Sequence, residues 1–323
     1  MKRRTFLGSA MLAGLAPWVA PLAAGSYPTR AVRVVSPYGP GGSNDTSARI
    51  VMQALSRQYG QEFVVENKPG AGTRIATDSV ARSPGDGYTL LWAAAPFAIN
   101  TAGKAKLQYD IKRDFVPIGP PVVGPVFLIV NADSPIKTLA QFVQYARQKP
   151  DGVTFASPGS GSGPHLTAEL FAIKAGFKGL NVHYRGDATS YTELIAGRVD
   201  ATLTAITTAL PHIENGTLRV LAVASPARSE ISPETPTFAE LGFPDVVGYG
   251  WFGLIAPKGT PDAVAQQLNA DVNAVFNDAD IRKRLLALGL EPGRGSNRDF
   301  QTFIDDEVVK WSEVIETAGI TLE

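Results

Sequence analysis

Short runs rich in β-branched residues alternate with amphipathic segments along most of this 323-residue chain, and this alternation restricts the folds available to it. In the first series, strands are predicted at 30–36, 62–67 and 88–94, and helices at 47–59 and 77–81. A β–α–β–α–β order favours a parallel sheet with helices on its faces. The chain is therefore predicted to be an α/β protein.

A second series of the same kind begins near residue 125. Its strands are predicted at 126–130, 153–157, 180–186, 200–206 and 218–225, and its helices at 134–149, 164–176 and 189–198. Ser134 and Pro135 are expected to cap and begin the first of these helices. A strand at 251–257 is followed by two long predicted helices, 261–277 and 300–318. Two such series indicate two α/β domains.

The first series contains a glycine-rich turn, "SPYGPGGSND", between a strand and a helix. Backbone N–H groups at the start of a helix bind anions, and glycine lets a ligand approach the backbone closely. Gly41, Gly42 and Ser43 are expected to donate such N–H groups. Asp45 is expected to orient the loop from the start of the helix rather than to face an anion.

The second series repeats this layout in "VTFASPGSGSGPHL". The amides of residues 159–163 and the hydroxyl groups of Ser160 and Ser162 are the expected donors. Ordinary strand-to-helix turns also favour glycine, serine and aspartate, which leaves a purely structural interpretation open. Because the two loops occupy matching positions of two domains, we predict a cleft with an anion-binding loop on either side.

The first 25 residues are predicted to be a signal peptide. Residues 2–4 are basic, residues 6–20 are apolar, and "PLAAG" is a small-residue zone with cleavage expected near residue 24 or 25. "KRRTFLG" is similar to the twin-arginine export motif, and an ordinary Sec signal is the alternative. The mature protein is therefore expected to be exported.

Composition argues against several classes of function. The chain has no cysteine, which excludes a structural disulfide, a thiolate nucleophile and a cysteine-based zinc site. Three histidines without close helical spacing give no indication of a metal site. Basic and acidic residues balance at 30 each, so nothing suggests a nucleic-acid partner. We expect no metal, no cofactor and no nucleic acid.

Enzyme motifs fit the two loops poorly. The first loop lacks the Gly-Lys-Ser/Thr ending of a P-loop, and the second has Gly161 where a nucleophile elbow requires serine. A triad of Ser162, His165 and Asp200 can be drawn, but nothing in the sequence brings these residues together. A secreted serine hydrolase using Ser160 or Ser162 is nevertheless the alternative to a binding protein without catalysis.

The chain resembles the Bug-type periplasmic receptors, the solute-binding components of tripartite tricarboxylate transporters. The matching segments extend over essentially the whole mature chain and include "YPTRAVRVVSPYGPGGSNDTSAR", "VVENKPGAG", "GSGSGPHLTAELF", "GRVDA", "PTFAELGFP" and "WFGLIAPKGTP". The resemblance implies a two-domain periplasmic-binding-protein fold of the Venus-flytrap type (type II), each domain a mostly parallel sheet flanked by helices. Residues 26–124 and 250–323 would form domain 1, and residues 125–249 domain 2.

By the same resemblance, the protein would be a periplasmic monomer that captures a small carboxylate in the interdomain cleft and delivers it to membrane permease subunits. In this family, mostly backbone amides, hydroxyl groups and ordered waters hold the carboxylate. Because neither glycine-rich loop contains lysine or arginine, we predict that no ion pair is the main contact here. The residues expected to bind it are Tyr38, Gly41, Gly42, Ser43, Ala71, Gly72, Ser157, Gly159, Ser160, Gly161, Ser162, His165, Thr204 and Thr207.

Specificity is expected to depend on places where the chain departs from the family pattern. "GAGTRIA" replaces the usual "GAGGNIG", which puts Thr73 and Arg74 on the cleft side. Arg74 either meets the far end of a dicarboxylate or is a solvated surface arginine. Phe97 and Arg185 are the other residues expected to influence specificity. The departures prevent the identity of the carboxylate from being carried over.

Overall fold

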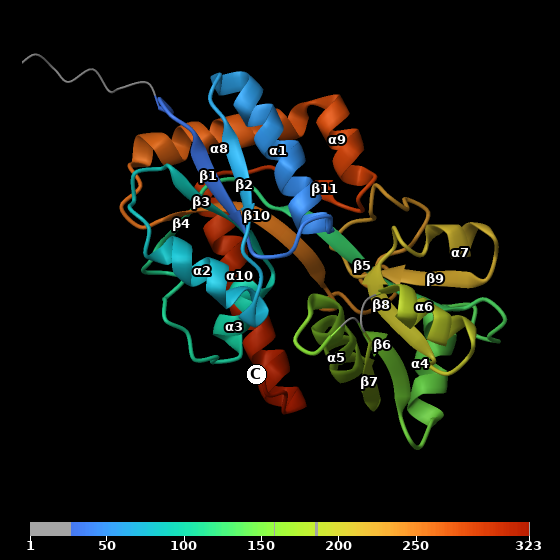
Figure 1. Cartoon of the computed structure of the whole chain (residues 1–323). Helices are drawn as coiled ribbons and strands as arrows, with labels where there is room; N and C mark the ends of the chain where they lie inside the picture. Colours follow the sequence, from blue (N-terminus) through green and yellow to red (C-terminus); the bar gives the residue numbers. More distant parts are fainter. Residues whose placement is uncertain (1–26, 158, 185–186, 323) are drawn as a thin grey trace, which may run out of the picture.

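The computed structural model describes residues 27–157, 159–184 and 187–322, which form two lobes joined by shared strands (Figure 1). The predicted signal peptide and Arg185 lie outside the described residues. The strands form a continuous sheet in the order β2-β1-β3-β10-β5-β8-β6-β7, with β4, β9 and β11 paired alongside. The α/β fold predicted from the alternating pattern is confirmed.

The first lobe begins with a parallel β–α–β–α–β unit. Its strands are β1 (Val32–Ser36), β2 (Phe63–Asn67) and β3 (Thr89–Ala94), with β1 between the other two. Its helices are α1 (Ser43–Tyr59), the short 3₁₀ turn η1 (Ala71–Thr73), α2 (Arg74–Ala81) and α3 (Pro96–Ala102). The carboxyl ends of these parallel strands face the second lobe, which is the edge where α/β sheets bind ligands (Figure 1).

Two long strands connect the lobes. The first half of β5 (Val122–Asn131) pairs antiparallel with β10 (Tyr249–Pro257), and its second half pairs antiparallel with β8. β10 also pairs antiparallel with β3 and with β4 (Phe115–Pro117), while β11 (Glu291–Pro292) pairs with β5. The sheet is therefore mixed where the lobes meet and parallel at its outer strands. The predicted domain boundaries at 124/125 and 249/250 stay a prediction.

The second lobe is built on β6 (Val153–Ser157), β7 (Gly179–His183), β8 (Ala201–Ala205) and β9 (Leu218–Val223). β6 pairs parallel with β7 and β8. The helices α4 (Leu139–Gln148), α5 (Gly163–Ala175), α6 (Asp187–Ile195) and α7 (Leu210–Glu214) flank this sheet. Phe142, Phe155 and Phe171 are fully buried between the sheet and its helices.

After β10 the chain stays in the first lobe as α8 (Asp262–Asn277), α9 (Ala279–Leu286) and α10 (Asn297–Ala318). Two long helices were predicted here, and the additional α9 begins at the N-cap Asp278, whose carboxylate accepts from the amides of Asp280 and Ile281. α10 packs against α3 and buries Phe300, Ile304 and Trp311 beside Trp251. None of the helices in the described ranges is long and apolar enough to span a membrane.

Some predicted helix starts are wrong. α4 begins at Leu139 and not at Pro135, because Thr138 is the N-cap and accepts from the amide of Gln141 at 3.2 Å. Ser134 instead closes a turn by accepting from the amide of Ile136. α2 begins at Arg74, three residues before the predicted position. α1 begins at Ser43, one turn before the apolar pattern that marks it from residue 47, and Asp45 lies in its first turn as expected.

Candidate functional site

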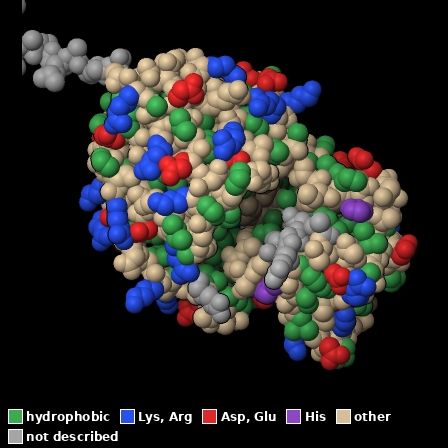
Figure 2. All heavy atoms as spheres, in the orientation of Figure 1, with side chains coloured by type: hydrophobic (Ala, Val, Ile, Leu, Met, Phe, Trp, Pro, Cys, Tyr) green, Lys and Arg blue, Asp and Glu red, His purple; other side chains and the backbone are tan. Residues whose placement is uncertain are grey.

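A cavity of about 680 Å³ lies between the two lobes, where the space-filling view is hollowed (Figure 2). It is lined by Tyr38, Gly72, Ala94, Ala95, Pro96, Ile99, Asn100, Gly159, Ser160, Gly161, Ser162, Gly163, Pro164, Gly250, Trp251, Phe252, Thr321 and Leu322. Among the described residues, no Asp, Glu, Lys, Arg or His lines it. The described lining residues can therefore offer a ligand amide and hydroxyl donors and an apolar wall, but no charged partner.

The second glycine-rich loop forms one side of this cavity. Ser162 is the N-cap of α5: its hydroxyl donates to the carbonyl of Gly159 at 2.7 Å and accepts from the amide of His165 at 3.3 Å. Gly161 has a φ of 69°, which favours glycine, and its N–H donates to Nδ1 of His165 at 2.9 Å. Ser160 is exposed, and its N–H and hydroxyl groups have no partner within the described parts of the chain.

A polar cluster lies beneath this loop and does not line the cavity. Ser157 is buried, with its Oγ 2.6 Å from Nδ1 of His183. The rings of His165 and His183 meet edge to face with centroids 4.8 Å apart, and Nε2 of His165 lies 3.7 Å from Glu169. Partial desolvation and the neighbouring His165 lower the pKa of His183. Ser157 and His165 thus support the loop from below.

In the first loop, Asp45 orients the turn as predicted. Its Oδ2 accepts from the N–H of Gly41 at 3.0 Å, and the same carboxylate accepts from Arg49 and Asn67. Burial raises the pKa of Asp45, but hydrogen bonds from Arg49, Gly41 and Asn67 more than offset this, and the pKa lies below its ordinary value. The amide of Gly41 is therefore already occupied.

Gly41, Gly42 and Ser43 are exposed and follow Tyr38, but they do not line the cavity in this arrangement of the lobes. The amides of Gly42 and Ser43 have no acceptor among the described residues, as expected at the N-terminus of α1. Tyr38 keeps 38% of its surface exposed, yet the surrounding protein desolvates it and raises its pKa to about 12. Its phenol is therefore neutral at pH 7 and able to donate.

The turn between β2 and α2 reaches the cavity through Gly72 alone. Ala71, Gly72 and Thr73 all have positive φ, and Nδ2 of Asn100 donates to the carbonyl of Gly72 at 2.9 Å. Thr73 is buried, and its hydroxyl has no hydrogen-bond partner among the described residues. Nε of Arg74 donates to the carbonyl of Ala71 at 2.8 Å, and Arg74 is not part of the cavity lining.

Other predicted site residues lie elsewhere. Phe97 is in the core of the first lobe, edge to face with Phe115. Thr204 is buried on β8, opposite Phe127 of β5. Thr207 faces the first lobe, with its hydroxyl 3.5 Å from the carbonyl of Leu288. The fold does not bring these three residues to the cavity.

The triad drawn from Ser162, His165 and Asp200 is not assembled. The Asp200 carboxylate is held by Nζ of Lys149 at 2.6 Å, the hydroxyl of Tyr145 at 2.7 Å and the amide of Thr154 at 2.7 Å. These partners hold the Asp200 carboxylate beside Thr154, at the beginning of β6. The loop that carries Ser162 follows Ser157, at the other end of that strand. Among the described residues there is no cluster of three or more metal-ligating His, Asp or Glu side chains.

Several lining residues were not predicted: Ala94–Pro96, Ile99 and Asn100, Gly250–Phe252, and Thr321 with Leu322. The first two groups lie where β3 passes directly into α3. The sequence predicted only that a strand ends before Pro96, and it did not predict the helix α3. Gly250–Phe252 lie where β10 crosses between the lobes. No sequence motif indicated Thr321 or Leu322.

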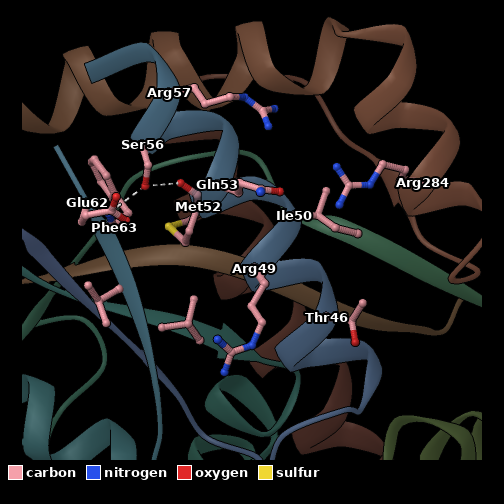
Figure 3. Close-up of a pocket in the computed structure, with 12 residues that line it drawn as sticks. Thr46, Arg49, Ile50, Met52, Gln53, Ser56, Arg57, Glu62, Phe63 and Arg284 are labelled. Carbon is pink, nitrogen blue, oxygen red and sulfur yellow. Dashed lines mark hydrogen bonds between the residues drawn. The ribbon is translucent and has the colours of Figure 1, made fainter. Parts of the chain in front are cut away.

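A second cavity, of about 730 Å³, lies on the outer face of the first lobe between α1 and β2 (Figure 3). Arg57 from α1 and Arg284 from α9 lie at its rim, and the hydroxyl of Ser56 accepts from the amide of Phe63 at its end. This groove belongs to one lobe and contains neither glycine-rich loop. The interlobe cavity is therefore the better candidate, although it is slightly smaller.

Comparison with known proteins agrees with this geometry. Residues 47–320 match the model of the tripartite tricarboxylate transporter family receptor. The chain is 34% identical to Protein BugT of Bordetella pertussis over 308 residues, 94% of each chain. Two solved structures are also similar. R. palustris Rpa4515 with adipate is 34% identical, with a TM-score of 0.76, and the match covers 91% of this chain and 99% of that one. MatC from Rhodopseudomonas palustris with bound malate is 30% identical, with a TM-score of 0.73, and the match covers 90% of this chain and 100% of that one. The chain belongs to the Bug-type receptor family of the tripartite tricarboxylate transporters, a family of periplasmic solute-binding proteins with a two-domain fold.

Proposed function

We propose that this protein is exported to the periplasm, where it captures a small organic acid in the interlobe cavity and delivers it to the permease subunits of a tripartite transporter, without catalysis. The observation that carries the proposal is the cavity itself: both lobes line it, the second glycine-rich loop forms one side, and none of the described lining residues is charged. A carboxylate there would be held by N–H and O–H donors, which form strong hydrogen bonds to an anion.

The two lobes offer different donors to such a ligand. Ser160 from the second loop and Tyr38 from the first already line the cavity. The amides of Gly42 and Ser43, at the N-terminus of α1, would join them when the lobes close. Closure of this kind, with β5 and β10 as the connecting strands, would couple ligand capture to a change of shape that a permease can recognise.

Two structural relatives have bound carboxylates, adipate in one and malate in the other, which supports this class of ligand. The best ligand should be sought with a thermal-shift panel of mono-, di- and tricarboxylates. A chromogenic ester panel should be run beside it. Stabilisation by an acid without ester turnover supports a receptor, whereas turnover that is lost in Ser162→Ala would support a hydrolase instead.

Calorimetric titration of two Gly42 variants then tests the role of the backbone donors. Gly42 has a φ of −80°, which proline tolerates, so Gly42→Pro mainly removes the N–H donor. Its affinity for the best acid should fall at least tenfold, about what one charge-assisted hydrogen bond provides. Gly42→Ala keeps the N–H and adds a methyl group where no atom lies within 4 Å, so its loss should be much smaller. Equal affinities of Gly42→Pro and the wild type would remove the first loop from the site.

A further inference from the structure

The segment that follows α10 returns to the cavity between the lobes. Gly319 ends the helix in a left-handed conformation, and the amide of Ile320 donates back to the carbonyl of Ile315 at 3.0 Å. This turn sends the chain toward α3 (Figure 1), and Thr321 and Leu322 become part of the cavity lining. Leu322 is half-buried and packs on the core cluster of the first lobe.

The side chain of Leu322 fits between two glycines that belong to different lobes. A methyl group placed on Gly103, just after α3, would lie 2.3 Å from Cδ1 of Leu322. A methyl group on Gly161, in the second glycine-rich loop, would lie 2.7 Å from Cδ2. Because neither glycine has a side chain, each leaves room for one of the two Cδ methyl groups of Leu322. Leu322 thus bridges the first lobe and the ligand loop of the second.

Leu322 places apolar surface directly beside the ligand loop. Its Cδ2 lies against Gly161, between Ser160 and Ser162 in the chain, and the almost fully buried Ile99 and Ala95 also line the cavity. An acid whose carboxylate meets the loop would place its carbon skeleton beside this apolar surface. A hydroxyl group on that skeleton would lose water there without gaining a partner from Leu322.

We propose that Leu322 is a specificity-determining residue that spans the lobes and favours acids with an unsubstituted aliphatic skeleton over their hydroxylated analogues. This inference rests on the proposed function of the cavity as a carboxylate site. It also assigns a role in holding the two lobes together to the segment after α10.

The test uses two matched pairs of acids, succinate with malate and glutarate with 2-hydroxyglutarate, titrated by calorimetry into the full mature chain. The wild type should bind the unsubstituted acid of each pair more tightly. Leu322→Ala should lose about tenfold in affinity for that acid and much less for its hydroxylated analogue, which narrows the preference. Leu241→Ala, which truncates a more exposed leucine outside the cavity lining, should change the affinity for neither acid.

Gly103→Ala provides an independent approach, because it displaces Leu322 without altering the ligand loop. Gly103 has a φ of −79°, so alanine adds no backbone strain, and its methyl group would instead collide with Leu322. Gly103→Ala should therefore lose affinity for the unsubstituted acid to the same extent as Leu322→Ala. In a Leu322→Ala background the same change should have little further effect, because the colliding atoms are gone.

The outcomes separate this inference from the proposed function. If the wild type binds an acid but Leu322→Ala weakens both members of each pair equally, or neither, the specificity role of Leu322 is refuted and the receptor function stands. If the wild type binds no acid, the proposed function fails, and with it the specificity role. The bridging role is then judged from the ligand-free protein by small-angle X-ray scattering: Leu322→Ala and Gly103→Ala should both increase the radius of gyration, and unchanged values would overturn it.

Discussion

Replacing Asp45 with asparagine should destabilise the protein and weaken ligand binding together. The Asp45 carboxylate is buried, with 4% of the side chain exposed, and accepts from Gly41, Arg49 and Asn67 at 2.8–3.1 Å. Asparagine keeps one acceptor oxygen and so loses about two of these interactions. Hydrogen bonds to a charged group contribute roughly 1.5–3 kcal/mol each, but half of the Arg49 side chain is exposed, which reduces its share. We therefore expect a loss of about 2 kcal/mol in the free energy of unfolding.

Asp200→Asn is the matched control. Asp200 has a similar set of partners, from Lys149, Tyr145 and Thr154, but lies in the second lobe away from the loops. Urea unfolding at pH 7 should show a comparable loss of stability in both variants. Only Asp45→Asn should also weaken binding of the best acid, because it releases the Gly41 amide and loosens the first loop before the ligand arrives. Unchanged stability of Asp45→Asn, or equal loss of affinity in both variants, would refute the reasoning.

Three further predictions follow from the same contacts. Burial raises the pKa values of Asp45 and Asp200, but hydrogen bonds more than offset this and hold both below the ordinary 3.8. The stability that the two carboxylates contribute should be complete above about pH 4 and be lost as the pH falls through their native pKa values. In urea unfolding from pH 5 downward, the free energy of unfolding of the Asp45→Asn/Asp200→Asn double variant should therefore fall less steeply than that of the wild type. Arg74→Ala should change the affinities for a dicarboxylate and its monocarboxylate analogue equally in calorimetry, because Arg74 is held at Ala71 and does not line the cavity; a selective loss of the dicarboxylate would return Arg74 to the site. Gly253→Ala should lower the free energy of unfolding by about 1–3 kcal/mol in urea, because its methyl group would lie 2.4 Å from Cζ of Phe300. Gly250→Ala on the same strand is the control, because its methyl group would meet only one atom, at 3.9 Å, and equal stabilities of the two variants would contradict the packing argument.

Local sequence patterns predicted the parts of the fold that local chemistry determines. Short apolar runs, several of them rich in β-branched residues, marked the strands β1, β2, β3 and β6, and the glycine-rich turns marked the loops that follow β1 and β6. The role of Asp45 followed from its position at the start of a helix. At α4 the pattern predicted Ser134 as the N-cap, and this was wrong: Ser134 closes a local turn by accepting from the amide of Ile136, whereas Thr138 caps the helix by accepting from the amide of Gln141.

What depends on contacts between distant segments was beyond the sequence pattern. A buried strand has the same apolar sequence pattern whether it pairs parallel or antiparallel with its neighbour. The antiparallel pairing of β5 with β10 could therefore not be predicted from the sequence. Phe97 and Ile99 lie on one short helix, and only its packing on Phe115 shows that the former enters the core while the latter reaches the cavity. Leu322 is more than 150 residues from Gly161, and a lone leucine carries no signal of such a contact.

A crystal structure of the protein with its best acid, chosen by the thermal-shift panel, tests the central claim most directly. The ligand should lie in the interlobe cavity, with its carboxylate oxygens within about 3.2 Å of amide or hydroxyl donors from Gly42, Ser43 and the 159–162 loop. A carboxylate bound instead to an arginine guanidinium, above all in the outer groove beside Arg57 and Arg284, would contradict the account.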